Sequence, residues 1–167
     1  NLTKLLLATG ARVTAVEIDH GFARLLRDVF SGQPDFDLHE MDVLDAGRIS
    51  PEILAALPKG SPLAPWVLAA NLPYQIATTC IVEILHLVSP PFLAVVTIQK
   101  EVARRLRARP GNREYSALSV LVQSRASVKH VADVPAGAFW PKPKVDSAIV
   151  RLEPYEQDPA ADRPLLR

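Results

Sequence analysis

The sequence predicts a doubly wound α/β domain, with a mostly parallel sheet, helices on both faces and an antiparallel hairpin at one edge. Two observations predict it. Four short strand-like runs alternate along the chain with segments of helical length, which is typical of parallel strands joined by right-handed crossovers. Near the end of the chain two further strand-like runs follow each other with no helix between them, which is typical of an antiparallel pair.

The first part of the chain is predicted to hold two strands and three helices. A helix over 2–8 ends at Gly10, a residue suited to the left-handed conformation after a helix. The other predicted elements are a strand over 12–16, a helix over 21–30, a strand over 36–41, a short helix over 51–57 and a Pro/Gly/Ser loop over 58–65.

The second part begins with a buried strand over 66–70 that runs directly into Asn71-Leu72-Pro73-Tyr74. Further on we expect a helix over 76–88, a strand over 92–98, a basic helix from 100 to about 108, a turn at 110–112 and a helix over 116–125. Strands over 128–131 and 145–152 enclose a Pro-rich loop at 139–144, and the polar tail is predicted to be a linker.

Composition narrows the class of protein. A chain of 167 residues with 49% apolar and 22% charged residues fits one globular domain with a hydrophobic core. The single Cys80 excludes a disulfide framework, and none of the four histidines has a Cys or carboxylate partner at ligand spacing, so no metal site is predicted. No apolar run has the roughly 18 residues of a membrane span. We expect a cytoplasmic protein without a metal or a membrane partner.

Three of the predicted parallel strands end in a polar residue, namely Glu17, Asp42 and Asn71. Ligands of open α/β sheets bind beyond the carboxyl ends of the strands. Glu17 is placed to accept hydrogen bonds from the ribose hydroxyls of a nucleoside cofactor, and Asp42 from the amine of its adenine, with Val43 against the ring. Taken singly, each acid is more typical of a loop or of the start of a helix than of a cofactor site. Together they are compatible with a dinucleotide or with S-adenosylmethionine.

The segment Asn71-Leu72-Pro73-Tyr74 separates these two cofactors, because it suits a planar amine substrate. The lone pair of adenine N6 is delocalised into the ring, so the amine is a poor nucleophile. The side-chain oxygen of Asn71 and the carbonyl of Leu72 or Pro73 would bond the two N6 hydrogens and favour a pyramidal nitrogen. Stacking of Tyr74 on the base is worth roughly 1–3 kcal/mol. The alternative is a proline-containing turn capped by Asn71.

Charge is divided unevenly along the chain. Residues 1–96 hold six Lys or Arg against ten Asp or Glu, whereas residues 97–167 hold thirteen against eight. Such a basic region can bind a polyanion, although a solvated helix face would also account for it.

The Pro-rich loop places Phe139 beside two lysines, so Phe139 is a candidate for the second wall of a base pocket. Helical spacing puts Arg104 with Arg107, and Arg105 with Arg109, on shared faces. The candidate RNA-binding residues are Lys100, Arg104, Arg105, Arg107, Arg109, Arg113, Lys142 and Lys144.

Four segments together, 71–74, 99–103, 115–123 and 139–147, resemble the KsgA-type ribosomal RNA adenine dimethyltransferases. The resemblance implies a Rossmann-like class I methyltransferase fold that uses S-adenosylmethionine. It implies that Glu17, Ile18, Asp42 and Val43 hold the cofactor, that Asn71 contacts cofactor and target amine, and that Tyr74 and Phe139 sandwich the adenine. The implied reaction, part of ribosome biogenesis, is N6,N6-dimethylation of two adjacent adenosines near the 3′ end of small-subunit (16S) ribosomal RNA, within an immature 30S subunit. A monomer is expected.

The sequence also departs from this family's pattern. A glycine-rich cofactor loop should precede the chain, and Asn1-Leu2-Thr3 resembles only its last residues. A helical C-terminal domain is expected after Arg167. We therefore expect an N-terminally truncated catalytic domain over 1–153 and a linker over 154–167, with weak cofactor binding and little turnover.

Two other functions stay open on the sequence alone. One is large-subunit RNA adenine methylation of the antibiotic-resistance type, against which Leu72 and the segment 115–123 favour the small-subunit enzyme. The other is a non-catalytic RNA-binding or ribosome-assembly factor with the same fold, against which the intact Glu17, Asp42, Asn71 and Tyr74 argue. A nicotinamide oxidoreductase would leave Asn71 to Tyr74 unexplained.

Overall fold

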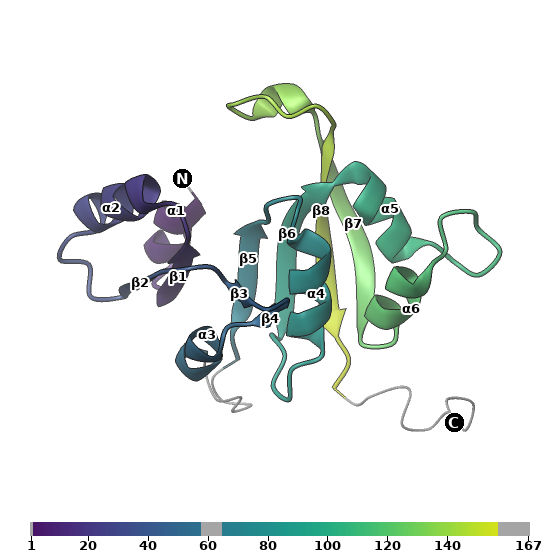
Figure 1. The fold of residues 1–167 in the computed structure, drawn as a ribbon, viewed down its shortest axis with the longest axis horizontal. Helices are drawn as coiled ribbons and strands as arrows, with labels where there is room; N and C mark the ends of the chain where they lie inside the picture. Colours follow the sequence, from purple (N-terminus) through teal and green to yellow (C-terminus); the bar gives the residue numbers. More distant parts are fainter. Residues whose placement is uncertain (1, 58–64, 157–167) are drawn as a thin grey trace. The chain divides into compact units, whose positions relative to one another are not determined.

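The computed structural model describes residues 2–57 and 65–156. The chain forms two compact units, residues 1–57 and 58–167, and each is described by itself (Figure 1). Almost all of the predicted loop at 58–65 and of the predicted linker at 154–167 lies outside the described residues. Within the described part, no helix combines the length and the apolar composition needed to cross a bilayer.

The first unit is built on two parallel strands. Its elements are α1 (Leu2–Ala8), β1 (Val13–Glu17), α2 (His20–Val29), β2 (Phe36–Glu40), β3 (Leu44–Asp45), β4 (Arg48–Ile49) and α3 (Pro51–Ala56). β1 pairs with β2 in parallel, from Val13 opposite Phe36 to Glu17 opposite Glu40. Asp19 caps α2 by accepting the Phe22 amide at 2.8 Å, which satisfies a donor that the first helical turn leaves unpaired. Both predicted strands and all three predicted helices of this part are confirmed.

The hairpin of β3 and β4 is an element that the sequence prediction missed. Leu44 pairs with Ile49 and Asp45 with Arg48, so the loop has only two residues. Both loop residues have positive φ, 47° at Ala46 and 79° at Gly47, as in the tight turns that match the twist of a hairpin. Gly47 was the available signal, but alanine rarely adopts the positive φ that Ala46 has here, and two-residue strands show no periodicity.

The second unit contains a four-stranded sheet. Its elements are β5 (Val67–Asn71), α4 (Ala77–Leu85), β6 (Leu93–Gln99), α5 (Lys100–Arg107), α6 (Ala117–Gln123), β7 (Ala126–Val134), the short 3-10 helix η1 (Ala136–Ala138) and β8 (Ser147–Pro154). The strand order is β5-β6-β8-β7, with β5 and β6 parallel and β8 antiparallel to both of its neighbours. The predicted antiparallel hairpin at the sheet edge is confirmed. The sheet is mixed, and β7 is longer than predicted.

The core of this unit lies between one face of the sheet and the three helices α4, α5 and α6 (Figure 1). Alternate residues of β6, such as Val96 and Ile98, and of β8, such as Val150 and Leu152, are fully buried there. Each helix adds its own buried apolar residues, including Ile81, Leu106 and Val122. Burial of each such side chain stabilises the fold by about 1.5–3 kcal/mol, so the sheet is a firm support for whatever lies at its edges.

Helix α5 ends earlier than its charge pattern predicted. Ala108 is already extended (φ −62°, ψ 141°), and Arg109 precedes Pro110, a position that disfavours helix. Arg109 therefore lies outside the helix, and the prediction that it shares a helical face with Arg105 is wrong. The side-chain amide of Gln123 donates to the carbonyls of Leu106 and Ala108, both at 2.8 Å, and so closes the end of α5.

The loop between β7 and β8 projects beyond the sheet (Figure 1). Asp146 fastens its base, because its carboxylate accepts the Ala136 amide at 2.9 Å and its carbonyl accepts the Lys100 amide at 3.0 Å. The loop is thus tied across its own base and to the first residue of α5.

Candidate active site at the carboxyl edge of the strands

One edge of the four-stranded sheet collects several of the predicted site residues. Asn71 at the end of β5 lies opposite Thr97 near the end of β6, and Gln99 at the end of β6 lies opposite Ser147 at the start of β8. Val134 at the end of β7 also lies opposite Ser147. The turn that follows Asn71 and the loop that carries Phe139 therefore emerge from the same edge. This is the edge at which α/β sheets bind ligands.

The turn after β5 presents an amide and a carbonyl. Asn71 is exposed, and the amide of Leu72 donates to the Thr97 carbonyl at 3.2 Å, which holds the turn against β6. The Pro73 carbonyl accepts two hydrogen bonds, from the amides of Ile76 at 3.1 Å and Ala77 at 3.0 Å, and so begins the turn into α4. The Leu72 carbonyl accepts no hydrogen bond from the residues the structure describes. Of the two carbonyls that the sequence left open as amine acceptors, the structure therefore favours Leu72.

Tyr74 is held across the end of the sheet by a residue that the sequence prediction missed. Its hydroxyl lies 2.8 Å from the Ser147 hydroxyl, and Ser147 is fully buried. Because the hydrogen bond runs from the turn after β5 to the first residue of β8, the phenol ring spans the end of β6. Ser147 closes the 139–147 motif, and only the three-dimensional structure shows that it meets Tyr74.

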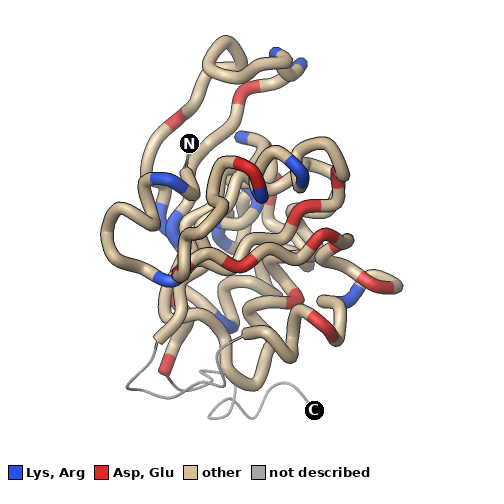
Figure 2. The backbone as a smooth tube through the Cα atoms, turned by 90° about the vertical axis from the view of Figure 1, so that its left-hand side faces the viewer, with Lys and Arg blue, Asp and Glu red and all other residues tan. Residues whose placement is uncertain are grey.

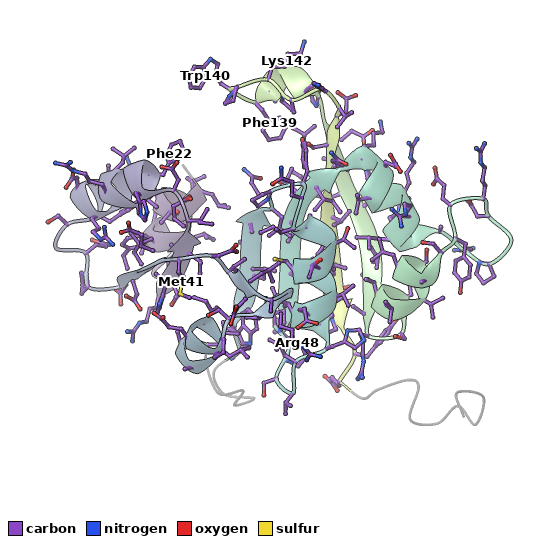
Figure 3. The ribbon with its side chains drawn as sticks, in the orientation of Figure 1. Phe22, Met41, Arg48, Phe139, Trp140 and Lys142 are labelled. Carbon is purple, nitrogen blue, oxygen red and sulfur yellow. The ribbon has the colours of Figure 1, made fainter. Side chains whose placement is uncertain are left out.

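Phe139 lies in the projecting loop, just after η1. Figure 3 shows its ring on the side of the loop that faces the sheet, whereas Trp140 and Lys142 point away from it. Tyr74 and Phe139 do not form an aromatic pair with each other among the described rings. Both aromatic residues come from the carboxyl edge, and the stacking of an adenine between them stays a prediction.

The predicted cofactor acids lie at the ends of the two parallel strands of the first unit. Glu17, half-buried, accepts the Asp19 amide at 2.9 Å, and Asp42, exposed, accepts the Leu44 amide at 2.9 Å. A carboxylate has about four acceptor positions, so each acid keeps capacity for hydroxyl or amine donors. Ile18 beside them is largely exposed and Val43 is half-buried. These donor and acceptor types fit the ribose and adenine of a nucleoside cofactor.

Glu40, opposite Glu17 on β2, differs from those two acids because it is already paired. It binds His20 and Arg27, and the hydrogen bond from His20, followed by that from Arg27, lowers its pKa below the usual range. The negative charge of Glu40 is therefore balanced by residues of the protein itself. Neither Glu17 nor Asp42 has an ion pair with any described residue.

A hollow of about 310 Å³ lies where α5 begins beside the base of the projecting loop. Its lining residues are Gln99, Lys100, Glu101, Arg104, Val145 and Asp146. Lys100 is bound to Asp133 at 2.6 Å, and His130 binds the same carboxylate at 2.8 Å. These two contacts, the hydrogen bond from Lys100 first, lower the pKa of Asp133. The predicted RNA-binding residue Lys100 is thus engaged in the base of the loop.

The remaining predicted RNA-binding residues fall into two groups. Arg104 lies 3.4 Å from Glu114, so its charge is partly neutralised. Arg105 is half-buried. The exposed members that form no ion pair with the described residues are Arg107, Arg109, Arg113, Lys142 and Lys144. No group of three or more His, Cys, Asp or Glu in the described ranges could hold a metal ion.

The family model described as ribosomal RNA adenine dimethylase matches residues 1–167. The chain belongs to this family. Among similar relatives, proteins named Ribosomal RNA small subunit methyltransferase A are 43% identical in Phenylobacterium zucineum, over 97% of the chain and 54% of the relative, and 43% identical in Synechocystis, over 99% of the chain and 59% of the relative.

Solved structures extend the family assignment to the fold. A dimethyladenosine transferase from Plasmodium falciparum superposes with a TM-score of 0.69 at 31% identity, covering 87% of the chain and 48% of that structure. The 23S rRNA methyltransferase ErmE gives 0.68 at 28% identity, covering 88% and 54%. The predicted Rossmann-like methyltransferase fold is thereby confirmed. The chain spans a little over half the length of the curated relatives it matches.

Proposed function

We propose that this protein is the catalytic part of an enzyme that transfers methyl groups from S-adenosylmethionine to adenine N6 in small-subunit ribosomal RNA. The observation that carries the proposal is the turn after β5 at the carboxyl edge of the strands. There the Asn71 side chain is exposed, and the Leu72 carbonyl accepts no hydrogen bond from the described residues. Membership of the ribosomal RNA adenine dimethylase family supports the reaction class.

The turn would prepare the amine for reaction. Asn71 Oδ1 and the Leu72 carbonyl each accept one N6 hydrogen, which draws the nitrogen lone pair out of conjugation and aims it away from the base plane. Tyr74, anchored through Ser147, supports one face of the base. Phe139 supports the other face from the projecting loop. The cofactor supplies the methyl group; one N6 proton is released for each methyl group added.

The cofactor would be held by the carboxyl ends of β1 and β2. Glu17 would accept hydrogen bonds from the ribose hydroxyls and Asp42 from the adenine amine. Val43 would lie against the adenine ring, and Ile18 is a further cofactor-binding residue. For Asn71 we propose a contact with the cofactor as well as with the target amine. Free acceptor positions on both carboxylates support these roles.

The substrate we propose is the pair of adjacent adenosines near the 3′ end of 16S ribosomal RNA, in an immature 30S subunit in the cytoplasm, acted on by a monomer. Relatives at 39–43% identity carry the name Ribosomal RNA small subunit methyltransferase A, whereas the large-subunit enzyme ErmE is 28% identical. Exposed cations after α5 and in the projecting loop support binding to an RNA backbone.

The test is to map methylated adenosines. The full-length product of the gene, S-adenosylmethionine and small-subunit particles that lack the modification are incubated, and the RNA is analysed by mass spectrometry. We expect two N6,N6-dimethyladenosines per particle, adjacent and near the 3′ end. Methylation of large-subunit RNA instead would support the antibiotic-resistance type of enzyme. Tight RNA binding without any methylation would support a non-catalytic assembly factor.

A further inference from the structure

Trp140 is an aromatic residue for which the proposed chemistry has no use. It lies in the loop between β7 and β8 with 96% of its surface exposed. Its indole makes no hydrogen bond and no ring contact with the described residues. By contrast the other tryptophan, Trp66, is half-buried and donates its indole N–H to the Ser89 carbonyl at 3.3 Å. Tryptophan is highly buried on average, so full exposure of this ring indicates that a partner covers it.

The loop holds Trp140 in a defined direction. The backbone at Phe139 is extended (φ −111°, ψ 149°), so the side chains of Phe139 and Trp140 leave it on opposite sides, as Figure 3 shows. Pro141 and Pro143 fix two of the φ angles that follow. The contacts of Asp146 close the base of the loop. An indole presented in this way loses little conformational freedom when a partner stacks on it.

Charge around the ring indicates the chemistry of that partner. Lys142 and Lys144 are both exposed, and Figure 2 shows Lys and Arg positions at the projecting end of the loop, with Asp and Glu where it joins the strands. At that base Asp133 is already paired with Lys100, and Asp146 with the Ala136 amide. An aromatic face beside two cations that have no ion pair with the described residues matches a nucleotide, whose base stacks while its phosphates contact the lysines.

We propose that Trp140 stacks on an unpaired base that flanks the target adenosine, while Phe139, on the other side of the same backbone, faces the target itself. This inference rests on the proposed function and adds a second base contact to it. Because adjacent Cα atoms are only about 3.8 Å apart, the two rings can take consecutive nucleotides only if the RNA strand is splayed around the loop. Trp140 thus separates the target from its neighbour.

The first test uses the tryptophan itself as the reporter. In the 167-residue chain with the substitution Trp66→Phe, all indole fluorescence comes from Trp140. We expect a hairpin RNA whose loop carries two adjacent adenosines to quench this emission with saturation. The variant Trp140→Ala retains only Trp66, whose emission should not change with the same RNA. Binding of the RNA without a change in the Trp140 emission would overturn the inference.

The second test locates the stacked base. Replacing Trp140 with Ala should weaken binding of the hairpin roughly 5- to 150-fold, the range that base stacking on an aromatic residue supports. Trp140→Phe should restore most of the affinity. Removing the base beside the target, as an abasic nucleotide, should weaken binding to the wild-type chain but not further weaken binding to Trp140→Ala. Additive losses would show that Trp140 contacts something other than that base.

Two controls separate stacking from general effects. Phe92 is also an exposed aromatic residue (68%), but it precedes β6 at the opposite edge of the sheet, so Phe92→Ala should leave the affinity unchanged. Trp140→Ala should keep the salt dependence of binding, because it removes no cation, whereas Lys142→Ala should reduce it.

A shift of the Trp140 emission with vesicles of zwitterionic and anionic lipid, and none with RNA, would identify a membrane contact and overturn the inference.

Failure of this inference is distinguishable from failure of the proposed function. If the full-length product of the gene dimethylates small-subunit particles equally well with Trp140→Ala, at limiting as well as saturating RNA, only the role of Trp140 is refuted. If the unaltered full-length product methylates no ribosomal RNA, the proposed reaction is refuted, and quenching of Trp140 would then report RNA binding alone.

Discussion

At the scale of single residues, the contact between Tyr74 and Ser147 shows how the site is positioned. The two hydroxyls are 2.8 Å apart, and Ser147 is buried, so water does not replace a lost partner freely. We regard Ser147 as a positioning residue that acts through Tyr74. Neither residue alone reveals the pair, since they are separated by most of the second unit in the sequence.

Replacing Ser147 with Ala should lower the free energy of unfolding by about 1 kcal/mol and raise the KM for RNA more than it lowers kcat, because the ring of Tyr74 loses its anchor. Chemical denaturation and steady-state methylation measure the two effects. Tyr74→Phe removes the same hydrogen bond from the other side. The double variant should therefore lose no more stability than either single variant. If the losses add, the two hydroxyls act independently and this account of Tyr74 is incorrect.

At the scale of the elements, the alternation of strands and helices predicted the fold well. Strands β1, β2, β5 and β6 and their intervening helices lie where apolar runs and helical periodicity placed them. The hairpin of β3 and β4 escaped because two-residue strands carry no periodicity. The position of β8 between β6 and β7 could not be deduced either, because strand order depends on which edges bury the most apolar surface.

Sequence reasoning about the site succeeded where function follows from position along a strand. Asn71 was expected at a strand end and lies there. Prediction from the sequence failed where the role of a residue depends on hydrogen bonds that only the folded structure brings together. The engagement of Pro73 in the turn into α4, the pairing of Lys100 with Asp133 and the anchoring of Tyr74 all come from partners distant in sequence or from local geometry.

Gln123 should be important for the stability of α5. Its amide serves the carbonyls of Leu106 and Ala108, so Gln123→Ala leaves two carbonyls at a helix end without their donor. We expect a loss of about 1–3 kcal/mol in the free energy of unfolding, measured by urea denaturation. Ser124→Ala is a suitable control, since its hydroxyl donates only to the Leu121 carbonyl at an exposed position. Equal losses in both variants would argue against the capping role.

Asp133 gives the base of the projecting loop a dependence on pH. The pKa of this carboxyl is lowered by Lys100 and then by His130, so the folded state binds its proton less readily than the unfolded state. Its contribution to stability is therefore present above the ordinary pKa of 3.8 and is lost as the pH falls through the lowered value. The stability difference between wild type and Asp133→Asn should exist at pH 6 and vanish in strong acid. A difference independent of pH, measured by urea denaturation, would contradict this.

At the scale of the whole molecule, charge separates the two parts of the sequence. Residues 1–96 are net acidic and residues 97–167 net basic, so the formal net charge of +1 conceals the region suited to RNA. Arg104 and Arg107 are both exposed in that region, but Arg104 has an acidic partner, Glu114, whereas Arg107 forms no ion pair with the described residues.

This distinction predicts different salt dependences of RNA binding. Arg107→Ala should reduce the slope of log affinity against log salt by about 0.7–0.9, the value for one lost phosphate contact. Arg104→Ala should reduce it by less, because Glu114 already neutralises part of that charge. Titrations of RNA at several salt concentrations measure both slopes. A larger change for Arg104 than for Arg107 would mean that Glu114 releases its partner when RNA binds.

The central claim is that the turn after β5 activates the adenine amine, and Asn71 tests it most directly. The measurement is the rate of N6-methyl transfer to small-subunit particles by the full-length product of the gene with Asn71→Ala, alongside its affinity for S-adenosylmethionine. Asn112→Ala is the control, since among the described residues the side-chain oxygen of Asn112 accepts a hydrogen bond only from the nearby Glu114 amide. Loss of one acceptor in the transition state predicts a rate about 100- to 1000-fold lower with most cofactor binding kept. A normal rate of transfer by Asn71→Ala would contradict the account.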